Sequence, residues 1–365
     1  MIEYRLQCLG CKAELDGSRW TWRHEPCGQP LTVKYTLTGD FKDYVDAGHG
    51  VKRYHRLLPV RVEDLPRIPV GGTPIVEETI KGVQVYYKLE YLNPSGSFKD
   101  RGAAVSVAKA LEYSLRDIVV DSSGNSAIAF SLYGSEAGLK VHVYVPSDAP
   151  PGKISILRLL GADLHLVEGS RENVNREAIE ASERGTSAYV GHWWNPYFIE
   201  GVKTIAYESH EQAGPFDYAV APVGSGTLIL GLYKGFKDLY MLGAGKMPRL
   251  IGVQACGYSR ICQEIRKVEC GEKSTLADGI RIEKPPRKSE ILEAIRSTEG
   301  TCITINDDAI RDSWSQLLKA GFLVEPTSAT AHAAILKLIV DGEIERGSKV
   351  LVPLTGSGLK HAISS

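Results

Sequence analysis

The stretch Asn93-Pro94-Ser95-Gly96-Ser97-Phe98-Lys99-Asp100-Arg101-Gly102 is the point around which the rest of the chain is organised. Asn-Pro and Ser-Gly favour a turn, an apolar strand precedes it and an alanine-rich helical run follows it. Lys99 therefore lies where a loop becomes a helix. The positive end of the helix dipole lies there and should lower the pKa of the Lys99 ammonium. A lower pKa favours the neutral amine, the form that attacks an aldehyde. Taken alone, a lysine in a polar turn is more often a solvated side chain.

From residue 83 onward, apolar strands alternate with amphipathic helices. Strands are predicted at 83–88, 117–121, 141–146, 162–168, 187–192, 217–223, 250–254 and 349–354. Helices are predicted at 100–113, 125–138, 151–160, 171–184, 201–213, 226–242, 306–320 and 327–340. This alternation predicts an open α/β architecture of parallel sheets, with ligands at the carboxyl ends of the strands. Functional residues are therefore expected in the strand-to-helix turns.

Two such turns are rich in small polar residues. Asp121-Ser122-Ser123-Gly124-Asn125-Ser126 can form an anion cradle for a carboxylate, although small polar residues are equally expected as a helix N-cap. Pro222-Val223-Gly224-Ser225-Gly226-Thr227 allows the backbone to approach a phosphate closely. The second turn lacks the Walker lysine and the full G-x-G-x-x-G pattern, so ATP and NAD are poorly supported.

Two segments near the C-terminus complete the pattern. The strand at 349–354 ends in Thr355-Gly356-Ser357-Gly358, and Glu325-Pro326-Thr327-Ser328-Ala329 opens a helix. Glu325 can also be read as a helix-entry acid stabilised by the dipole. The five segments, in this order from Asn93 to Lys360, resemble the pattern of the fold-type II pyridoxal-phosphate (PLP) enzymes, the tryptophan synthase β superfamily. The spelling of the lysine motif resembles the threonine synthase branch.

The resemblance implies a role for each matching residue. Lys99 would be the catalytic residue and hold PLP as a Schiff base, Asn125 would hydrogen-bond the phenolic oxygen of PLP, and Thr355 would face the pyridine nitrogen. A neutral hydroxyl there makes the ring a weaker electron sink, which directs the chemistry towards elimination and replacement. Further cofactor contacts are implied for Phe98, Val223, Gly224, Ser225, Gly226, Thr227 and Glu325. Substrate contacts are implied for Ser97, Ser123, Gly124 and Ser126.

The threonine synthase branch implies conversion of O-phospho-L-homoserine and water to L-threonine and phosphate. The segment Gly191-His192-Trp193-Trp194-Asn195-Pro196 departs from that branch, because two tryptophans stand where an arginine and small polar residues grip the substrate phosphate. Trp193 predicts a more apolar substrate surface, unless these aromatics belong to the core. The other departure is Ser357, where many members of the branch have histidine.

Two other functions stay open. The first is β-replacement or ammonia elimination on serine, phosphoserine or an acylated homoserine, on the same cofactor cage. The second is a regulatory protein that binds PLP or a metal without catalysis. Intact Lys99, Asn125 and Thr355 disfavour this second alternative.

The first 38 residues differ in composition from the rest. Cys8, Cys11, His24 and Cys27 form a C-x-x-C and an H-x-x-C pair, a ligand set suited to a tetrahedral structural zinc. The usual ribbon has a second C-x-x-C, so a small hairpin whose metal site has decayed is the alternative. Many threonine synthases begin with a comparable cysteine-rich ribbon.

Length, charge and cysteine usage set the remaining expectations. The 365 residues carry 43 Lys+Arg against 44 Asp+Glu, which gives no sign of a nucleic-acid or membrane partner. The N-terminus is charged at once and no apolar run is long enough to cross a membrane, which predicts a cytoplasmic protein. Seven cysteines do not resemble a secreted disulfide framework. The resemblance implies a homodimer and a small amino-acid substrate.

The predicted fold class is thus α/β, with two open twisted parallel-sheet domains of PLP fold type II and a small N-terminal cysteine-containing ribbon. The predicted boundaries are 1–38 for the ribbon, 39–93 with 201–365 for a large PLP-binding domain, and 94–200 for a small domain.

Overall fold

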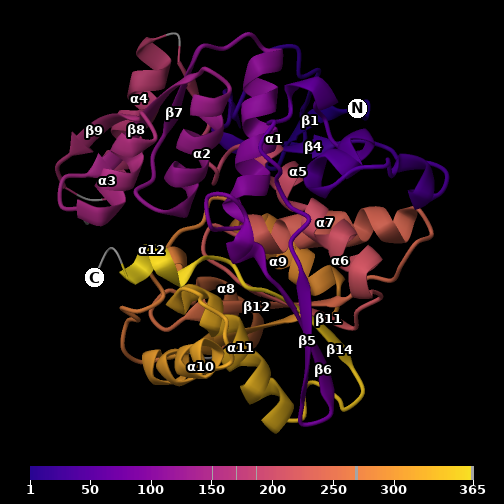
Figure 1. Cartoon of the computed structure of the whole chain (residues 1–365). Helices are drawn as coiled ribbons and strands as arrows, with labels where there is room; N and C mark the ends of the chain where they lie inside the picture. Colours follow the sequence, from indigo (N-terminus) through magenta and orange to yellow (C-terminus); the bar gives the residue numbers. More distant parts are fainter. Residues whose placement is uncertain (150, 170, 186, 268–269, 363–365) are drawn as a thin grey trace.

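The computed structural model describes residues 1–149, 151–169, 171–185, 187–267 and 270–362 (Figure 1). Strand β6 (Val83–Lys88) enters the 93–102 motif and helix α1 (Lys99–Glu112) leaves it, as predicted. Between them lies only a short 3-10 turn (Glu90–Leu92). Lys99 is therefore the first residue of a helix, as its sequence context indicated.

The larger sheet has six strands in the order β13-β12-β11-β14-β6-β5. Strands β6, β14, β11, β12 and β13 run parallel, and only β5 pairs antiparallel, with β6. The other five strands are β5 (Ile75–Ile80), β11 (Tyr218–Pro222), β12 (Arg249–Ala255), β13 (Thr301–Ile305) and β14 (Lys349–Pro353). The last strand in sequence thus lies in the middle of the sheet.

Helices bury both faces of this sheet. In β11, Ala219 and Ala221 belong to the core that contains α7 (Thr227–Met241) and α9 (Lys288–Ser297), whereas Val220 belongs to the core beneath α11 (Pro326–Val340). Alternate residues of a strand point to opposite faces, so a strand covered on both sides is apolar throughout. The remaining helices of this part are α6 (Thr204–Ala213), α8 (Arg260–Arg266), α10 (Asp307–Lys319) and α12 (Gly358–Ala362).

The smaller sheet is parallel, with the order β10-β7-β8-β9. Its strands are β7 (Asp117–Val120), β8 (Lys140–Pro146), β9 (Asp163–Val167) and β10 (Ala188–Tyr189). Its helices are α2 (Asn125–Glu136), α3 (Pro151–Leu159) and α4 (Arg171–Arg184), and Figure 1 shows this unit at the upper left, beside α1 and above α10 and α11. The division into 39–93 with 201–365 and 94–200 stays a prediction.

The N-terminal residues form an antiparallel sheet in the order β2-β1-β4-β3. Its strands are β1 (Arg5–Cys8), β2 (Glu14–Leu15), β3 (Arg23–His24) and β4 (Gln29–Lys34), and β4 packs against α5 (Pro196–Val202). Trp22 packs edge-on against Trp194 at 5.4 Å between ring centroids. The connector at 39–70 contains three 3-10 helices, Phe41–Tyr44, Gly50–Leu57 and Val62–Asp64.

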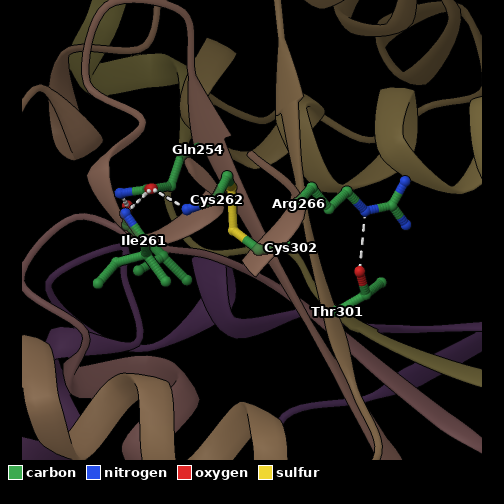
Figure 2. Close-up of a disulfide and its surroundings, with 7 residues drawn as sticks. Gln254, Ile261, Cys262, Arg266, Thr301 and Cys302 are labelled. Carbon is green, nitrogen blue, oxygen red and sulfur yellow. Dashed lines mark hydrogen bonds between the residues drawn. A yellow bond between two sulfur atoms is a disulfide. The ribbon is translucent and has the colours of Figure 1, made fainter. Parts of the chain in front are cut away.

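Four of the seven cysteines are paired, Cys256 with Cys270 and Cys262 with Cys302. Figure 2 shows the second disulfide joining α8 to β13. The side-chain oxygen of Gln254 accepts hydrogen bonds from the N–H groups of Ile261 and Cys262, and Arg266 Nε donates to Thr301 Oγ1. These contacts fix α8 on the sheet edge. The spacing of the cysteines in the sequence did not reveal the two disulfides. Over the described residues, no helix combines the length and apolarity of a membrane span.

Candidate active site

A cavity of about 480 Å³ opens where turns from both parallel sheets converge. This size lies within the range of small-molecule sites. The lining comes from the start of α1, the turn between β7 and α2, the turn between β11 and α7, and the segments at 278–282, 325–327 and 355–360. The expectation that functional residues gather in strand-to-helix turns holds for the first three of these segments.

Lys99 reaches into this cavity from the first turn of α1. Its Nζ lies 3.4 Å from Thr227 Oγ1 and 4.3 Å from the centroid of the Phe98 ring. Burial lowers the pKa of the Lys99 ammonium to about 7, although the negative charge of Glu325 raises it. The expected direction of the shift is thus reproduced, but its main cause is loss of water around the amine. About half of the Lys99 amines are neutral near pH 7.

Asn125 and Glu325 face each other across the cavity wall. Asn125 is the first residue of α2, and its Nδ2 donates to the Glu325 carboxylate at 3.0 Å. Glu325 is the residue before Pro326, which starts α11. Helix entry therefore accounts for the position of Glu325, but its carboxylate is directed at the cavity. Both predicted interpretations of this residue are combined in one side chain.

The 223–227 turn has the shape of an anion cradle. Gly226 has φ +87°, which favours glycine, and α7 begins at the next residue. A Cβ at Gly224 would approach Ile280 Cα to 2.9 Å, so only glycine fits between this turn and the segment at 279–282. Unpaired N–H groups at the start of a helix bind phosphate well. The turn therefore fits the phosphate group of a cofactor.

Thr355 is placed by Ser328, a residue that the sequence reasoning did not single out. The two hydroxyl oxygens are 2.9 Å apart, and Ser328 Oγ also accepts from the N–H of Gly356. If the Ser328 hydroxyl donates to Thr355 Oγ1, the Thr355 proton is free to point elsewhere. Thr355 lines the cavity, so its hydroxyl can serve a ring nitrogen bound there.

Most residues with an expected role line the cavity: Phe98, Lys99, Ser123, Gly124, Asn125, Ser126, Trp193, Gly224, Ser225, Gly226, Thr227, Glu325 and Thr355. Ser97 and Val223 do not. Ser97 is fully buried and forms a backbone bridge with Gly356, and Val223 is buried behind the turn. The buried Ser126 Oγ has no hydrogen-bond partner among the described residues. Buried hydroxyls are normally hydrogen-bonded, so this one is available to bind a ligand.

Several cavity residues were missed. Arg281, Lys360, His192 and Asp278 all contribute to the wall. Lys360 Nζ donates to the carbonyl oxygens of Ser95 and Gly96 within the lysine motif. Arg281 follows a single 3-10 turn (Asp278–Ile280) and its exposed side chain has no partner among the described residues. Two cations in the lining of the cavity suit an anionic substrate.

Trp193 and Trp194 have different environments. Trp193 lines the cavity, as the apolar-surface interpretation requires, whereas Trp194 packs on Trp22 of the N-terminal sheet, as the core interpretation requires. The nearly inaccessible Arg287 donates to the carbonyl oxygens of both residues and to that of Leu31. This one guanidinium therefore positions the segment that carries Trp193.

Residues 67–356 match the family described as "Pyridoxal-phosphate dependent enzyme". The chain is 32% identical to a threonine synthase of Methanosarcina acetivorans, over 98% of this chain and 92% of that protein. It is 34% identical to a threonine synthase of Halalkalibacterium halodurans, over 85% of this chain and 89% of that protein. The chain belongs to the threonine synthase family of pyridoxal-phosphate-dependent enzymes. The resemblance stated from the motifs is therefore confirmed.

A solved structure agrees with this family. The O-acetylserine-dependent cystathionine β-synthase of Helicobacter pylori aligns with a TM-score of 0.68 and 26% identity, covering 80% of this chain and 94% of that one. The predicted α/β class with parallel sheets is confirmed, and PLP is the cofactor of this family. The Lys99 amine, the Asn125 amide, the glycine turn at 224–227 and the Thr355 hydroxyl all line the cavity and fit that cofactor.

A buried ionic network lies beneath the lysine motif. The Arg101 guanidinium donates two hydrogen bonds to the Glu90 carboxylate and two to the Glu208 carboxylate, with N···O distances of 2.7 to 2.8 Å. Lys88 Nζ pairs with Glu208 at 2.9 Å, and the N–H of Gly72 donates to the same carboxylate. The turn Gly71-Gly72-Thr73-Pro74, which precedes β5 and β6, thus has a structural role. It holds the carboxylates that anchor α1 two residues after Lys99.

Proposed function

We propose that this enzyme converts O-phospho-L-homoserine and water to L-threonine and phosphate, with Lys99 as its catalytic base and acid. One observation carries the proposal: the Lys99 amine, whose pKa is lowered to about 7, enters a cavity that is also lined by the glycine-rich turn Gly224-Ser225-Gly226-Thr227. Membership of the threonine synthase family supports the choice of substrate. A base whose pKa lies near the working pH can both remove and return a proton.

The residues of the chain divide the work. Bound PLP supplies an aldehyde for the substrate amine and a ring that withdraws electrons. Ser123, Gly124 and Ser126, at the start of α2, hold the substrate α-carboxylate by N–H and hydroxyl donors. The neutral Lys99 amine would take the α-proton, give it back as an acid to the bound substrate and cofactor, and, neutral again, take a β-proton as phosphate leaves. These placements agree with the lining of the cavity.

The wall that carries Arg281 and Lys360 is the proposed position of the substrate phosphate. A guanidinium and an ammonium compensate the phosphate charge during binding and as the leaving group departs. They replace the arginine missing from the 191–196 segment and the histidine missing at Ser357. Ser357 itself packs against Gly96, with 3.3 Å between its Cβ and a Cβ built at that glycine.

Two observations favour a second candidate function, β-replacement or elimination. Trp193 gives the cavity an aromatic wall, and the solved relative from Helicobacter pylori is O-acetylserine-dependent. β-Replacement or ammonia elimination on serine, phosphoserine or an acylated homoserine would use the same Lys99. The lowered pKa of Lys99 disfavours a regulatory protein without catalysis, because such a protein does not need a neutral lysine amine.

The deciding experiment offers PLP-loaded protein O-phospho-L-homoserine and follows phosphate release and threonine formation together. Equal amounts of both products support the proposal, and the Lys99→Ala variant serves as the control without catalysis. If neither product forms while the cofactor absorbance responds to serine, phosphoserine or an acylated homoserine, the proposed substrate is wrong and the second function leads.

We also propose a structural zinc at Cys8, Cys11, His24 and Cys27. The four donor atoms lie within 4.8 Å of one another, with 3.4 Å between Cys8 Sγ and Cys27 Sγ and 3.4 Å between Cys11 Sγ and His24 Nδ1. Three thiolates and one imidazole form a closed structural zinc set. Elemental analysis should find this zinc, and Cys11→Ser should lose it and melt at a lower temperature. Zinc-free protein with the same melting temperature contradicts the proposal.

The predicted homodimer and cytoplasmic location stay proposals. Analytical ultracentrifugation of the purified protein checks the first, since twice the mass of one 39.9 kDa chain is expected. Cell fractionation checks the second.

A further inference from the structure

Two histidines and an aspartate gather on the neighbouring strands β8 and β9 of the smaller sheet, outside the active site. His142 lies on β8, and Asp163 and His165 lie on the edge strand β9. The parallel register places Asp163 opposite His142 and His165 opposite Tyr144. Because residues two apart share a face of a strand, the three side chains project from one face.

The three donor atoms form a small triangle. His142 Nδ1 lies 3.2 Å from His165 Nε2 and 3.1 Å from Asp163 Oδ2, and His165 Nε2 lies 3.8 Å from the same oxygen. A triangle with these sides has a centre about 2 Å from every corner, the length of a bond from zinc to nitrogen or oxygen. The donors are thus already at metal-binding distance from a common point.

The neighbours of the triangle orient its ligands. Asp117 Oδ1 faces the other ring nitrogen of His142, at 3.4 Å from Nε2. A proton on Nε2 leaves the Nδ1 lone pair for the metal, which is the carboxylate–histidine–metal arrangement of many sites. The ring of Tyr144 stacks on His165 at 4.4 Å with an angle of 8° and holds it in place. Both imidazoles therefore have fixed directions.

We propose that His142, Asp163 and His165 bind one divalent transition-metal ion such as Zn²⁺, with water in the remaining position. Two imidazoles and one carboxylate suit this class of ion. The side chains of Asp163 and His165 are 40% and 36% exposed, so an ion can enter from solvent. Lys140 Nζ competes for Asp163 Oδ2 at 2.9 Å and must move aside.

The ion would clamp the edge strand β9 to β8 and leave catalysis alone. Asp117 and Asp163 begin their strands, whereas the active-site turn follows the opposite end of β7. An ion that binds only the folded protein raises its stability by mass action. We therefore expect a higher melting temperature with Zn²⁺ and an unchanged turnover.

The test counts metal in full-length holoprotein after mild chelation and back-titration with Zn²⁺. His142→Gln, Asp163→Asn and His165→Gln should each bind one ion fewer than wild type, whatever the N-terminal cysteines hold. The matched control is His55→Gln, because His55 pairs with Asp46 but lies in no group of three donors within the described residues. When Co²⁺ replaces Zn²⁺, an ion at the N-terminal cysteines shows thiolate charge-transfer absorption, whereas an ion at His142, Asp163 and His165 does not. The three ligand variants should lose only the ion without this absorption.

Two further variants keep the proposal falsifiable if a ligand variant fails to fold. Lys140→Met should bind the ion more tightly, because the competing ammonium is gone, and Asp117→Asn should bind it about tenfold more weakly or worse. Wild type that takes up no thiolate-free ion overturns the proposal. Unaltered binding in all three ligand variants, or no tightening in Lys140→Met, overturns it equally.

Discussion

Lys99 and Arg101 are cations two residues apart on the same helix, yet their surroundings are opposite. Arg101 is fully buried and donates to four partners, Thr73, Glu90, Thr204 and Glu208. Lys99 faces the cavity, where the hydroxyl of Thr227 at 3.4 Å is its nearest hydrogen-bond partner among the described residues. A satisfied cation holds the fold together, whereas a desolvated cation without an ion pair is available for chemistry.

The largest effect that separates these two roles is expected for Lys99→Ala. Turnover of phosphohomoserine should fall by about 10⁴-fold, because no other described group takes the place of the amine. The free energy of unfolding of the cofactor-free variant should not fall, because the folded protein has to strip water from this lysine. Retained turnover, or marked destabilisation, would contradict the comparison.

Arg101→Met should have the reverse profile. It leaves the carboxylates of Glu90 and Glu208 facing a single ammonium, that of Lys88, and should cost about 3 to 5 kcal/mol of stability. The matched control is Arg61→Met, which removes the pair of a solvent-exposed guanidinium with Asp64 and should cost far less, because water screens such a pair. Urea unfolding measures both. Equal costs would show that the buried network is not what anchors α1.

The ionic network of Arg101, Glu90, Glu208 and Lys88 should lose its contribution to stability in acid. Despite burial, Arg101 and Lys88 hold the pKa of Glu208 at about 2, below its ordinary 4.5. Since the folded value is the lower one, this stability is complete above pH 4.5 and is lost as the pH falls from 4.5 towards 2. In Glu208→Gln, the loss of stability over this pH window should be smaller than in wild type. An identical acid profile would remove Glu208 from the explanation.

The pH dependence of cofactor uptake should report on Lys99. Apoprotein should take up PLP faster as the pH rises through about 7, because the attacking amine is then deprotonated. A solvated lysine would show this rise near its ordinary value of 10.5. Stopped-flow absorbance between pH 5.5 and 9 follows the reaction. A rate that still climbs steeply at pH 9 would show that burial does not lower this pKa.

The smallest effect is expected for Arg281→Ala. The KM for O-phospho-L-homoserine should rise about tenfold, with a lesser change in kcat, because a substrate phosphate contact is lost. Arg260→Ala, which removes another exposed arginine near the same segment, is the matched control and should change neither constant. An acylated homoserine, which has no phosphate, should not distinguish Arg281→Ala from wild type.

The sequence predicted the elements on which the site rests. Helices at 100–113 and 171–184 and strands at 83–88 and 349–354 agree with α1, α4, β6 and β14 to within one residue at each end. Two helices, α5 and α6, replace the single one at 201–213. The first begins at Pro196, for which Asn195 is the cap.

Strand β5 and helix α12 were not predicted, and three further missed elements lie together between 255 and 305. Helices α8 and α9 and the edge strand β13 alternate in no clear pattern, because they cover one edge of the sheet and keep polar residues. Arg281 was missed for the same reason, since it follows a short turn without a strand before it. The size of the Lys99 pKa shift was not predictable either, because it depends on burial in the fold and on the charge of Glu325, which is far away in the sequence.

Strand β14 also constrains how the protein can be made. It lies between β11 and β6, so the central gap of the larger sheet is filled by residues 349–353 of a 365-residue chain. During synthesis, β6 and β11 leave the ribosome long before their shared neighbour. A prematurely terminated product would lack both that neighbour and Thr355. Incomplete translation therefore yields a chain that can neither close its sheet nor complete its cofactor site, and such a chain is readily distinguished by the cell's proteases from the finished enzyme.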